Sequence, residues 1–102
     1  MNHVIEQHRT ELEQLCRKHR VKTLQLFGSA TQQDFDPTRS DLDFLVEYLP
    51  LPQGEHARAF FGLLHDLEDL FHRKIDLVMT RAIRDPYFLR GVNETRRMVY
   101  AA

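Results

Sequence analysis

The sequence is poor in cysteine, has no tryptophan and contains no long apolar run. Cys16 is the single cysteine among 102 residues, so an internal disulfide is impossible and the thiol content fits a reducing compartment. No segment approaches the length of a membrane span, and the opening residues MNHVIEQHRTE lack the apolar core of a secretory signal. We therefore expect a cytoplasmic protein without membrane association.

Neither sign of charge dominates the sequence. Lysine and arginine number 14, aspartate and glutamate 15, and the net charge is −1 with neutral histidines. This balance provides no overall field that would attract nucleic acid, so direct nucleic-acid binding is not expected. Hydrophobic residues make up 42%, as in globular proteins, and the length predicts a single domain spanning residues 1–102.

The spacing of apolar residues predicts alternating helices and strands. Helical spacing covers residues 4–19, 55–71 and the C-terminal segment from 86, where Phe88, Val92, Thr95 and Val99 would share one face. Strands are predicted at 21–27, 41–48 and 75–79. This order predicts an α/β (α+β) fold in which helices flank a small mixed sheet.

Three aspartates stand on two of the predicted strands. Asp41 and Asp43 alternate along the strand at 41–48, so their side chains would share a face roughly 7 Å apart. Asp76 lies in the strand at 75–79. Carboxylates gathered in this way repel one another, and Mg²⁺ with phosphate oxygens removes that cost. The spacing therefore favours a site for Mg²⁺ and a nucleoside triphosphate.

Gly28 and Ser29 end the first predicted strand at a tight turn. Glycine lets a backbone approach a phosphate closely, and the serine hydroxyl and the free N–H groups of a following turn can bind an anion. A phosphate turn beside metal-binding carboxylates is what nucleotidyl transfer requires, because that chemistry depends on positioning and charge neutralisation.

Each of these features also has an ordinary explanation when taken alone. Gly-Ser pairs are common in turns, and an Asp-x-Asp sequence often ends a strand in solvent. Asp76 could form a salt bridge with Lys74 or point outward from an edge strand. The combination of all three features in this order favours the functional interpretation.

The segment Leu26-Phe27-Gly28-Ser29, followed after eleven residues by Asp41-Leu42-Asp43, resembles the G-S-x(10–12)-D-x-D signature of the polymerase-β-like nucleotidyltransferase superfamily. More narrowly, the chain resembles the minimal nucleotidyltransferases (MNT) that serve as antitoxins in HEPN/MNT toxin–antitoxin pairs. The likeness extends over nearly the whole chain and includes residues 74–78 and 83–88.

The resemblance implies a polymerase-β-like fold and specific residue roles. Asp41 and Asp43 would bind the metal ions, Asp76 would share a metal and help deprotonate the attacking hydroxyl, and Gly28 and Ser29 would hold the β- and γ-phosphates. Family members are reported to transfer AMP from ATP to a tyrosine of the HEPN ribonuclease, which silences it. A cognate HEPN toxin, and a homo- or hetero-oligomer, are therefore expected.

One departure from the family pattern leaves alternatives open. Many relatives have an arginine three residues after the serine, where this chain has Gln32-Gln33, and a missing cation would weaken triphosphate binding. Arg39, Lys74 or Arg81 could compensate. A non-catalytic antitoxin that acts by binding alone is the first alternative. Transfer to a small molecule is the second, although such relatives usually have a further domain.

Overall fold

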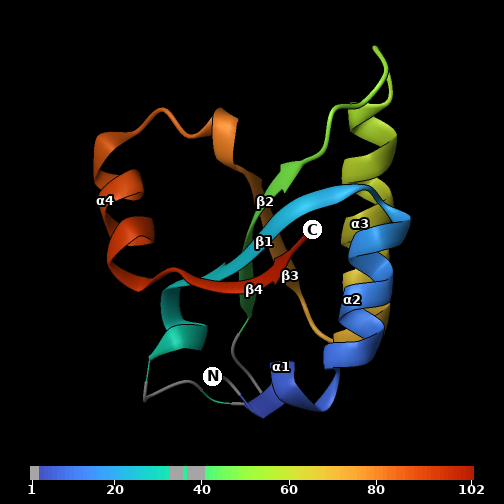
Figure 1. The fold of residues 1–102 in the computed structure, drawn as a ribbon. Coiled ribbons are helices and arrows are strands. Elements are labelled where there is room, and N and C mark those ends of the chain that lie inside the picture. The colour runs from blue at the N-terminus through green and yellow to red at the C-terminus, as the bar shows by residue number, and fades with distance from the viewer. Residues whose placement is uncertain (1–2, 33–35, 37–40) are drawn as a thin grey trace.

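The computed structural model describes residues 3–32, 36 and 41–102. Figure 1 shows a four-stranded sheet with helices on both sides. The helices are α1 (His3–Gln7), α2 (Arg9–Lys18), α3 (His56–Phe71) and α4 (Pro86–Thr95), and the strands are β1 (Val21–Phe27), β2 (Leu42–Tyr48), β3 (Ile75–Met79) and β4 (Arg97–Ala101). Two short 3₁₀ turns, η1 (Gly28–Thr31) and η2 (Thr80–Ala82), follow β1 and β3.

The sheet is mixed, as the sequence predicts. Its strand order is β3-β2-β1-β4. β1 pairs antiparallel with both β2 and β4, whereas β2 and β3 run parallel. The two central strands are thus β1 and β2, and the parallel pair places the starts of β2 and β3 side by side at one end of the sheet.

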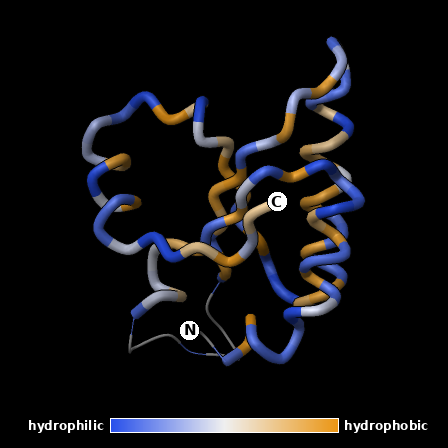
Figure 2. The backbone as a smooth tube through the Cα atoms, viewed as in Figure 1, coloured by the Kyte–Doolittle hydropathy of each residue, from blue (hydrophilic) through white to orange (hydrophobic). Residues whose placement is uncertain are grey.

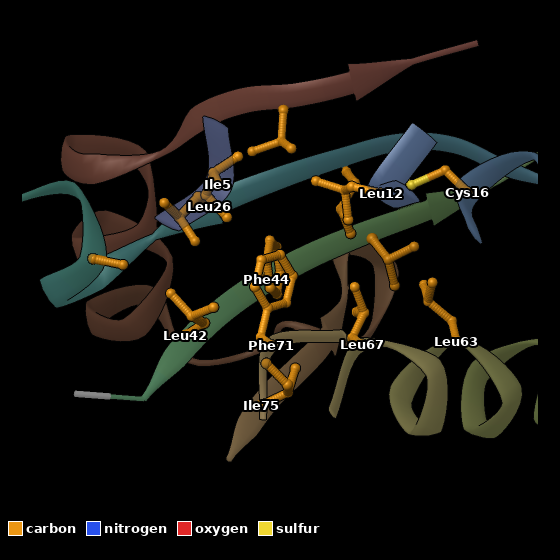
Figure 3. Close-up of a cluster of buried hydrophobic side chains, with 14 of the residues drawn as sticks. Ile5, Leu12, Cys16, Leu26, Leu42, Phe44, Leu63, Leu67, Phe71 and Ile75 are labelled. Carbon is orange, nitrogen blue, oxygen red and sulfur yellow. The ribbon is translucent and has the colours of Figure 1, made fainter. Parts of the chain in front are cut away.

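The main core lies between α2, α3 and one face of the sheet, because alternate strand residues point to that face. Figure 2 shows apolar residues recurring along these elements, and Figure 3 shows how their side chains meet. The labelled members are Ile5, Leu12, Cys16, Leu26, Leu42, Phe44, Leu63, Leu67, Phe71 and Ile75, all of them buried. Cys16 is buried, and its burial raises the pKa of the thiol to about 12.

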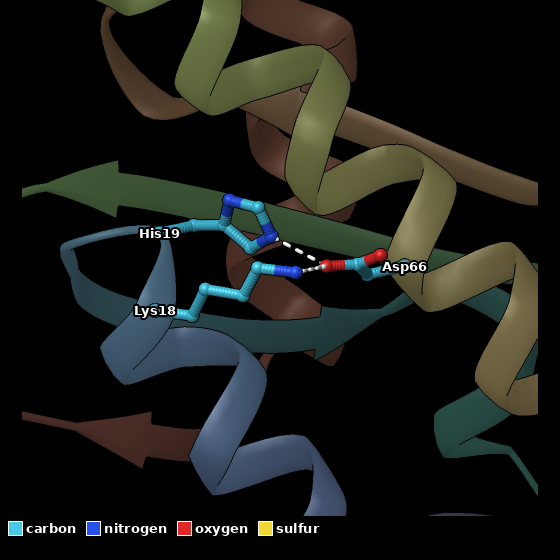
Figure 4. Close-up of polar contacts among 3 residues, drawn as sticks. All are labelled: Lys18, His19 and Asp66. Carbon is cyan, nitrogen blue, oxygen red and sulfur yellow. Dashed lines mark hydrogen bonds and ion pairs between the residues drawn. The ribbon is translucent and has the colours of Figure 1, made fainter.

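A polar contact ties α2 to α3 at the end of α2 (Figure 4). The Asp66 carboxylate accepts hydrogen bonds from Lys18 Nζ at 3.1 Å and lies 2.7 Å from His19 Nε2. The hydrogen bond with His19 is the main cause that lowers the pKa of Asp66, and the contact with Lys18 lowers it further. The contact adds an ion pair between the two helices that cover the core.

The N-terminal helical segment differs from the single helix predicted over residues 4–19. It is broken at His8, where the backbone has φ −119° and ψ 21°. Val4 and Ile5, which lie in α1, are both buried. The His8 ring also packs edge-on against Phe71 at a centroid distance of 5.4 Å.

The prediction that the last helix extends through Val99 is wrong. α4 ends at Thr95, and residues 97–101 form β4 beside β1. Val99 is buried in the main core as a strand residue, and Phe88, expected on a buried face, is 42% exposed. Sheet pairing with β1 satisfies backbone groups over a long sequence separation, which local spacing does not reveal.

Within the part of the chain that the structure describes, no helix is both long and apolar enough to cross a membrane.

Candidate functional site

The predicted site residues converge where the end of β1 meets the starts of β2 and β3. Strand pairing sets Phe27 opposite Asp43, and Asp43 opposite Asp76. Gly28 directly follows Phe27, so it lies beside Asp43. The register therefore brings Gly28, Asp43 and Asp76 together, although 48 positions separate the first and last of them in the chain.

Gly28 occupies a position that no other residue type would fit easily. Its φ is +72°, in the left-handed region that favours glycine. A Cβ placed on Gly28 would lie 2.6 Å from Oδ2 of Asp43. The absence of a side chain thus allows both the turn and the close approach of its backbone to the carboxylate.

Two threonines fix the Gly28 backbone. The Gly28 N–H donates a hydrogen bond to Oγ1 of Thr95 at 2.9 Å, and the Thr31 hydroxyl donates to the Gly28 carbonyl oxygen, also at 2.9 Å. The Thr95 hydroxyl in turn donates to the Gly91 carbonyl oxygen at 3.0 Å. The helical spacing predicts that Thr95 shares one face with Phe88 and Val92, and it does not indicate this role. Helical spacing alone could not have shown it.

The carboxylate of Asp43 is held in an unfavourable electrostatic environment. Burial is the main cause, followed by the hydrogen bond and the negative charge of Asp76, and together with Asp41 they raise the pKa of Asp43 to about 6. Lys74 acts in the opposite direction. A site that stores such repulsion between acids gains stability when a cation binds to it.

Asp41 and Ser29 lie at the border of this cluster. Asp41 precedes β2, and its carboxylate is 4.0 Å from Nζ of Lys74. The salt bridge considered for Asp76 and Lys74 is thus formed by Asp41. Ser29 is exposed in η1, and its carbonyl oxygen accepts a hydrogen bond from the Gln32 N–H. Two further residues named from the sequence, Gln33 and Arg39, lie outside the described residues.

The donor chemistry fits a divalent cation that takes only part of its coordination from protein. Within residues 3–32, 36 and 41–102, no group of three His, Cys, Asp or Glu side chains could hold a metal ion. Asp43 and Asp76 nevertheless offer hard oxygen donors side by side. Mg²⁺ commonly uses one or two carboxylates and completes its coordination with water and substrate phosphates.

Lys74 and Arg81 differ in their distance along β3 from this site. Lys74 immediately precedes β3, two residues before Asp76, and its charge lowers the pKa of Asp43. Arg81 lies in η2, beyond the other end of the strand. Of these two candidates for the missing cation, Lys74 is the one that acts on the site electrostatically.

The fold is shared with nucleotidyltransferases of known structure. A chain in a complex of tri-AMPylated Shewanella oneidensis HEPN toxin with MNT antitoxin aligns with a TM-score of 0.64 at 17% identity, covering 96% of this chain and 73% of that one. A toxin–antitoxin chain with AMP-PNP gives 0.66 at 20% identity, covering 92% and 73%. A structure described as a minimal nucleotidyltransferase gives 0.56 at 26% identity, covering 90% and 89%.

Sequence comparison points the same way. A Methanocaldococcus jannaschii protein that carries the provisional name protein adenylyltransferase is 33% identical over 93 residues, covering 83% of this chain and 91% of its own length. The model of the family described as "Nucleotidyltransferase domain" matches residues 5–99. The chain therefore belongs to the nucleotidyltransferase domain family, as the Gly-Ser and Asp-x-Asp motifs predict.

Proposed function

We propose that this protein transfers AMP from ATP, with Mg²⁺, to a hydroxyl of a cognate HEPN-type ribonuclease toxin and thereby acts as its antitoxin. The observation that carries the proposal is the convergence of Gly28, Asp43 and Asp76 at one end of the sheet. The names of the relatives support the adenylyl donor and the protein acceptor.

In the proposed reaction the acceptor oxygen attacks the α-phosphorus of ATP. A new bond forms between this oxygen and the α-phosphorus. The bond between the α-phosphorus and the oxygen that bridges the α- and β-phosphates breaks, and pyrophosphate leaves. Mg²⁺, when bound, neutralises the phosphate oxygens and the leaving group. Asp43 and Asp76 would hold the metal, and Asp76 would also accept the acceptor's proton. A tyrosine acceptor follows from the family resemblance.

The Gly28 turn would bind the β- and γ-phosphates. Its left-handed conformation and its two threonine contacts hold η1 against the start of β2 before any ligand arrives. Such preorganisation favours phosphoryl transfer, because positioning and charge stabilisation provide most of the rate enhancement. Lys74 would supply a positive charge near these groups in place of the arginine found in relatives.

Intact-mass spectrometry tests this function. The purified chain is incubated with ATP, Mg²⁺ and the protein encoded by the neighbouring gene, and we expect the neighbour to gain the mass of one or more AMP units. Asp43→Asn should abolish the gain, whereas Asp69→Asn, a matched change at an exposed residue of α3, should not. An unmodified neighbour would contradict the proposal.

A non-catalytic antitoxin is the second candidate. It is favoured by Gln32, which stands three residues after Ser29, where many relatives have an arginine. In that case the two proteins would co-elute and the toxin would be silent without any mass increase. Asp43→Asn would then leave neutralisation in cells unchanged.

A further inference from the structure

The turn proposed to bind the phosphates has no cation of its own. Residues 26–32 contain no lysine, arginine or histidine. Lys74 lies on the acidic side of the site, where its Nζ is 4.0 Å from a carboxylate oxygen of Asp41. A triphosphate carries more negative charge than one Mg²⁺ neutralises, and phosphoryl transfer depends on neutralising that charge. A cation on the other side of the Gly28 turn would complete the neutralisation.

Arg96 and Arg97 lie next to this turn, although they are far from it in the sequence. Thr95 accepts the hydrogen bond of the Gly28 N–H at 2.9 Å, so the next residue, Arg96, begins beside the turn. β4 then runs antiparallel to β1, with Arg97 opposite Leu26. Figure 1 shows the end of α4 and the start of β4 passing η1. Both arginine side chains are exposed.

The two arginines point to opposite faces of the sheet. Cross-strand partners share a face, and Leu26 lies in the main core, so Arg97 points to the side of α2 and α3. Arg96 has extended backbone, with φ −63° and ψ 141°, and neighbours in extended backbone point to opposite faces. The register continued by one residue sets Arg96 opposite Phe27, whose other partner is Asp43. Arg96 therefore shares the face that carries the Asp43 carboxylate.

Both its distance and its free hydrogen-bond donors suit Arg96 to bind phosphate. Two strand spacings separate it from Asp43, roughly 10 Å, which leaves room for phosphate groups between a guanidinium and a metal ion on the carboxylate. Nη1 of Arg97 instead donates to the carbonyl oxygens of Thr95 at 3.3 Å and Arg96 at 2.8 Å. Among the residues that the structure describes, none forms a hydrogen bond or ion pair with the Arg96 side chain. Its planar fork of donors matches the oxygens of a phosphate.

The acidic residues of the α4 region do not neutralise Arg96. Glu94 is exposed two positions earlier, and residues two apart on a helix do not face each other. Asp85 lies at the opposite end of α4, where its Oδ1 accepts a hydrogen bond from the Tyr87 N–H. The C-terminal end of a helix also favours a nearby cation through its dipole. A role limited to the dipole would change the stability of α4 and leave phosphate binding intact, so experiment separates the two roles.

We propose that Arg96 binds the β- and γ-phosphates from the α4 side of the Gly28 turn. This inference rests on the proposed site for Mg²⁺ and a nucleoside triphosphate, and it adds the residue that completes the neutralisation of charge. Arg96 and Lys74 then supply positive charge from opposite sides of the site. Thr95 keeps Arg96 beside the turn through its contact with the Gly28 N–H.

Calorimetric titration with two probes tests this role: AMP-PNP and inorganic tripolyphosphate, each with Mg²⁺. Arg96→Gln should weaken the binding of both probes about tenfold or more, the scale of a hydrogen bond to a charged group. Arg97→Gln is the matched control, because it removes the same charge from the adjacent residue on the other face. At about 0.15 M salt, which screens charges beyond about 8 Å, it should change either affinity by about twofold or less. Both variants alter exposed side chains and should melt close to wild type.

Each outcome decides the inference. Selective weakening of both probes in Arg96→Gln supports it. Equal weakening in the two variants would indicate general attraction by charge and overturns it. Unchanged affinity in Arg96→Gln, with or without a lower melting temperature, also overturns it and leaves the proposed transfer standing. Weaker binding of AMP-PNP alone would place Arg96 at the nucleoside and overturns it as well.

Two further results separate this inference from the proposed function. If the wild type binds neither probe, the inference fails together with the proposed site. If Arg96→Gln is selectively impaired but the wild type transfers no AMP to the protein encoded by the neighbouring gene, the phosphate contact stands and the proposed transfer fails.

Discussion

Gly28 illustrates at the residue scale how one position serves both fold and chemistry. Gly28→Ala should reduce the free energy of unfolding by about 1–3 kcal/mol, because it combines a left-handed φ with a Cβ 2.6 Å from Asp43 Oδ2. Gly54 provides the matched control, since its φ is +88° but a Cβ there would meet no atom within 4 Å. Urea denaturation should show Gly54→Ala to be less destabilising. Equal losses would contradict the close approach.

Asp43 makes the stability of the metal-free protein depend on pH. Its folded pKa of about 6 exceeds its ordinary value of 3.8, so between these values the folded state binds more protons than the unfolded state. Stability from this group therefore falls as pH rises from about 4 to 6. We expect Asp43→Asn to melt a few degrees above wild type at pH 7.5 and to match it near pH 4.

The comparison isolates Asp43, because both proteins retain Asp66, whose lowered pKa acts in the opposite direction at lower pH. Adding Mg²⁺ at pH 7.5 should raise the melting temperature of wild type and leave Asp43→Asn unchanged. A variant that is less stable than wild type at every pH would show that the Asp43 carboxylate is not strained.

At the scale of elements, α4 and the Gly28 turn act as one unit through Thr95. Thr95→Val removes the acceptor for the Gly28 N–H, whereas Thr95→Ser keeps it. We expect Thr95→Val to raise the KM for ATP several-fold with a smaller change in kcat, and Thr95→Ser to restore it. If the serine variant fails as the valine variant does, Thr95 contributes only packing.

The elements also separate what local sequence can and cannot predict. The alternation of residues predicts β1 and β3 at their observed bounds. The start of the last helix at residue 86 is also confirmed, and the Asp85 Oδ1 before it accepts a hydrogen bond from the Tyr87 N–H at 2.9 Å. β4 was missed because Val99 also fits the helical spacing of the preceding residues. Only its pairing with β1, more than 70 positions earlier, selects the strand.

At the scale of the molecule, the order of motifs predicted the family and the general place of the site. It did not predict register, and register decides which acids meet: Asp43 lies opposite Asp76, while Asp41 pairs with Lys74. The exposure of α4 could not be predicted from the sequence for a related reason. The exposure of Tyr87 and Leu89 depends on where α4 packs, and Val92 is the one residue of α4 that is buried.

Gly28, Asp43 and Asp76 are proposed to form a site for Mg²⁺ and a triphosphate. The most direct measurement is calorimetric titration of the chain alone with AMP-PNP, with and without Mg²⁺, because it needs no acceptor. We predict saturable, Mg²⁺-dependent binding by wild type and Asp69→Asn. Asp43→Asn should bind AMP-PNP at least about tenfold more weakly than wild type. Binding that is equal in all three proteins, or that does not depend on Mg²⁺, would show that these residues do not form such a site.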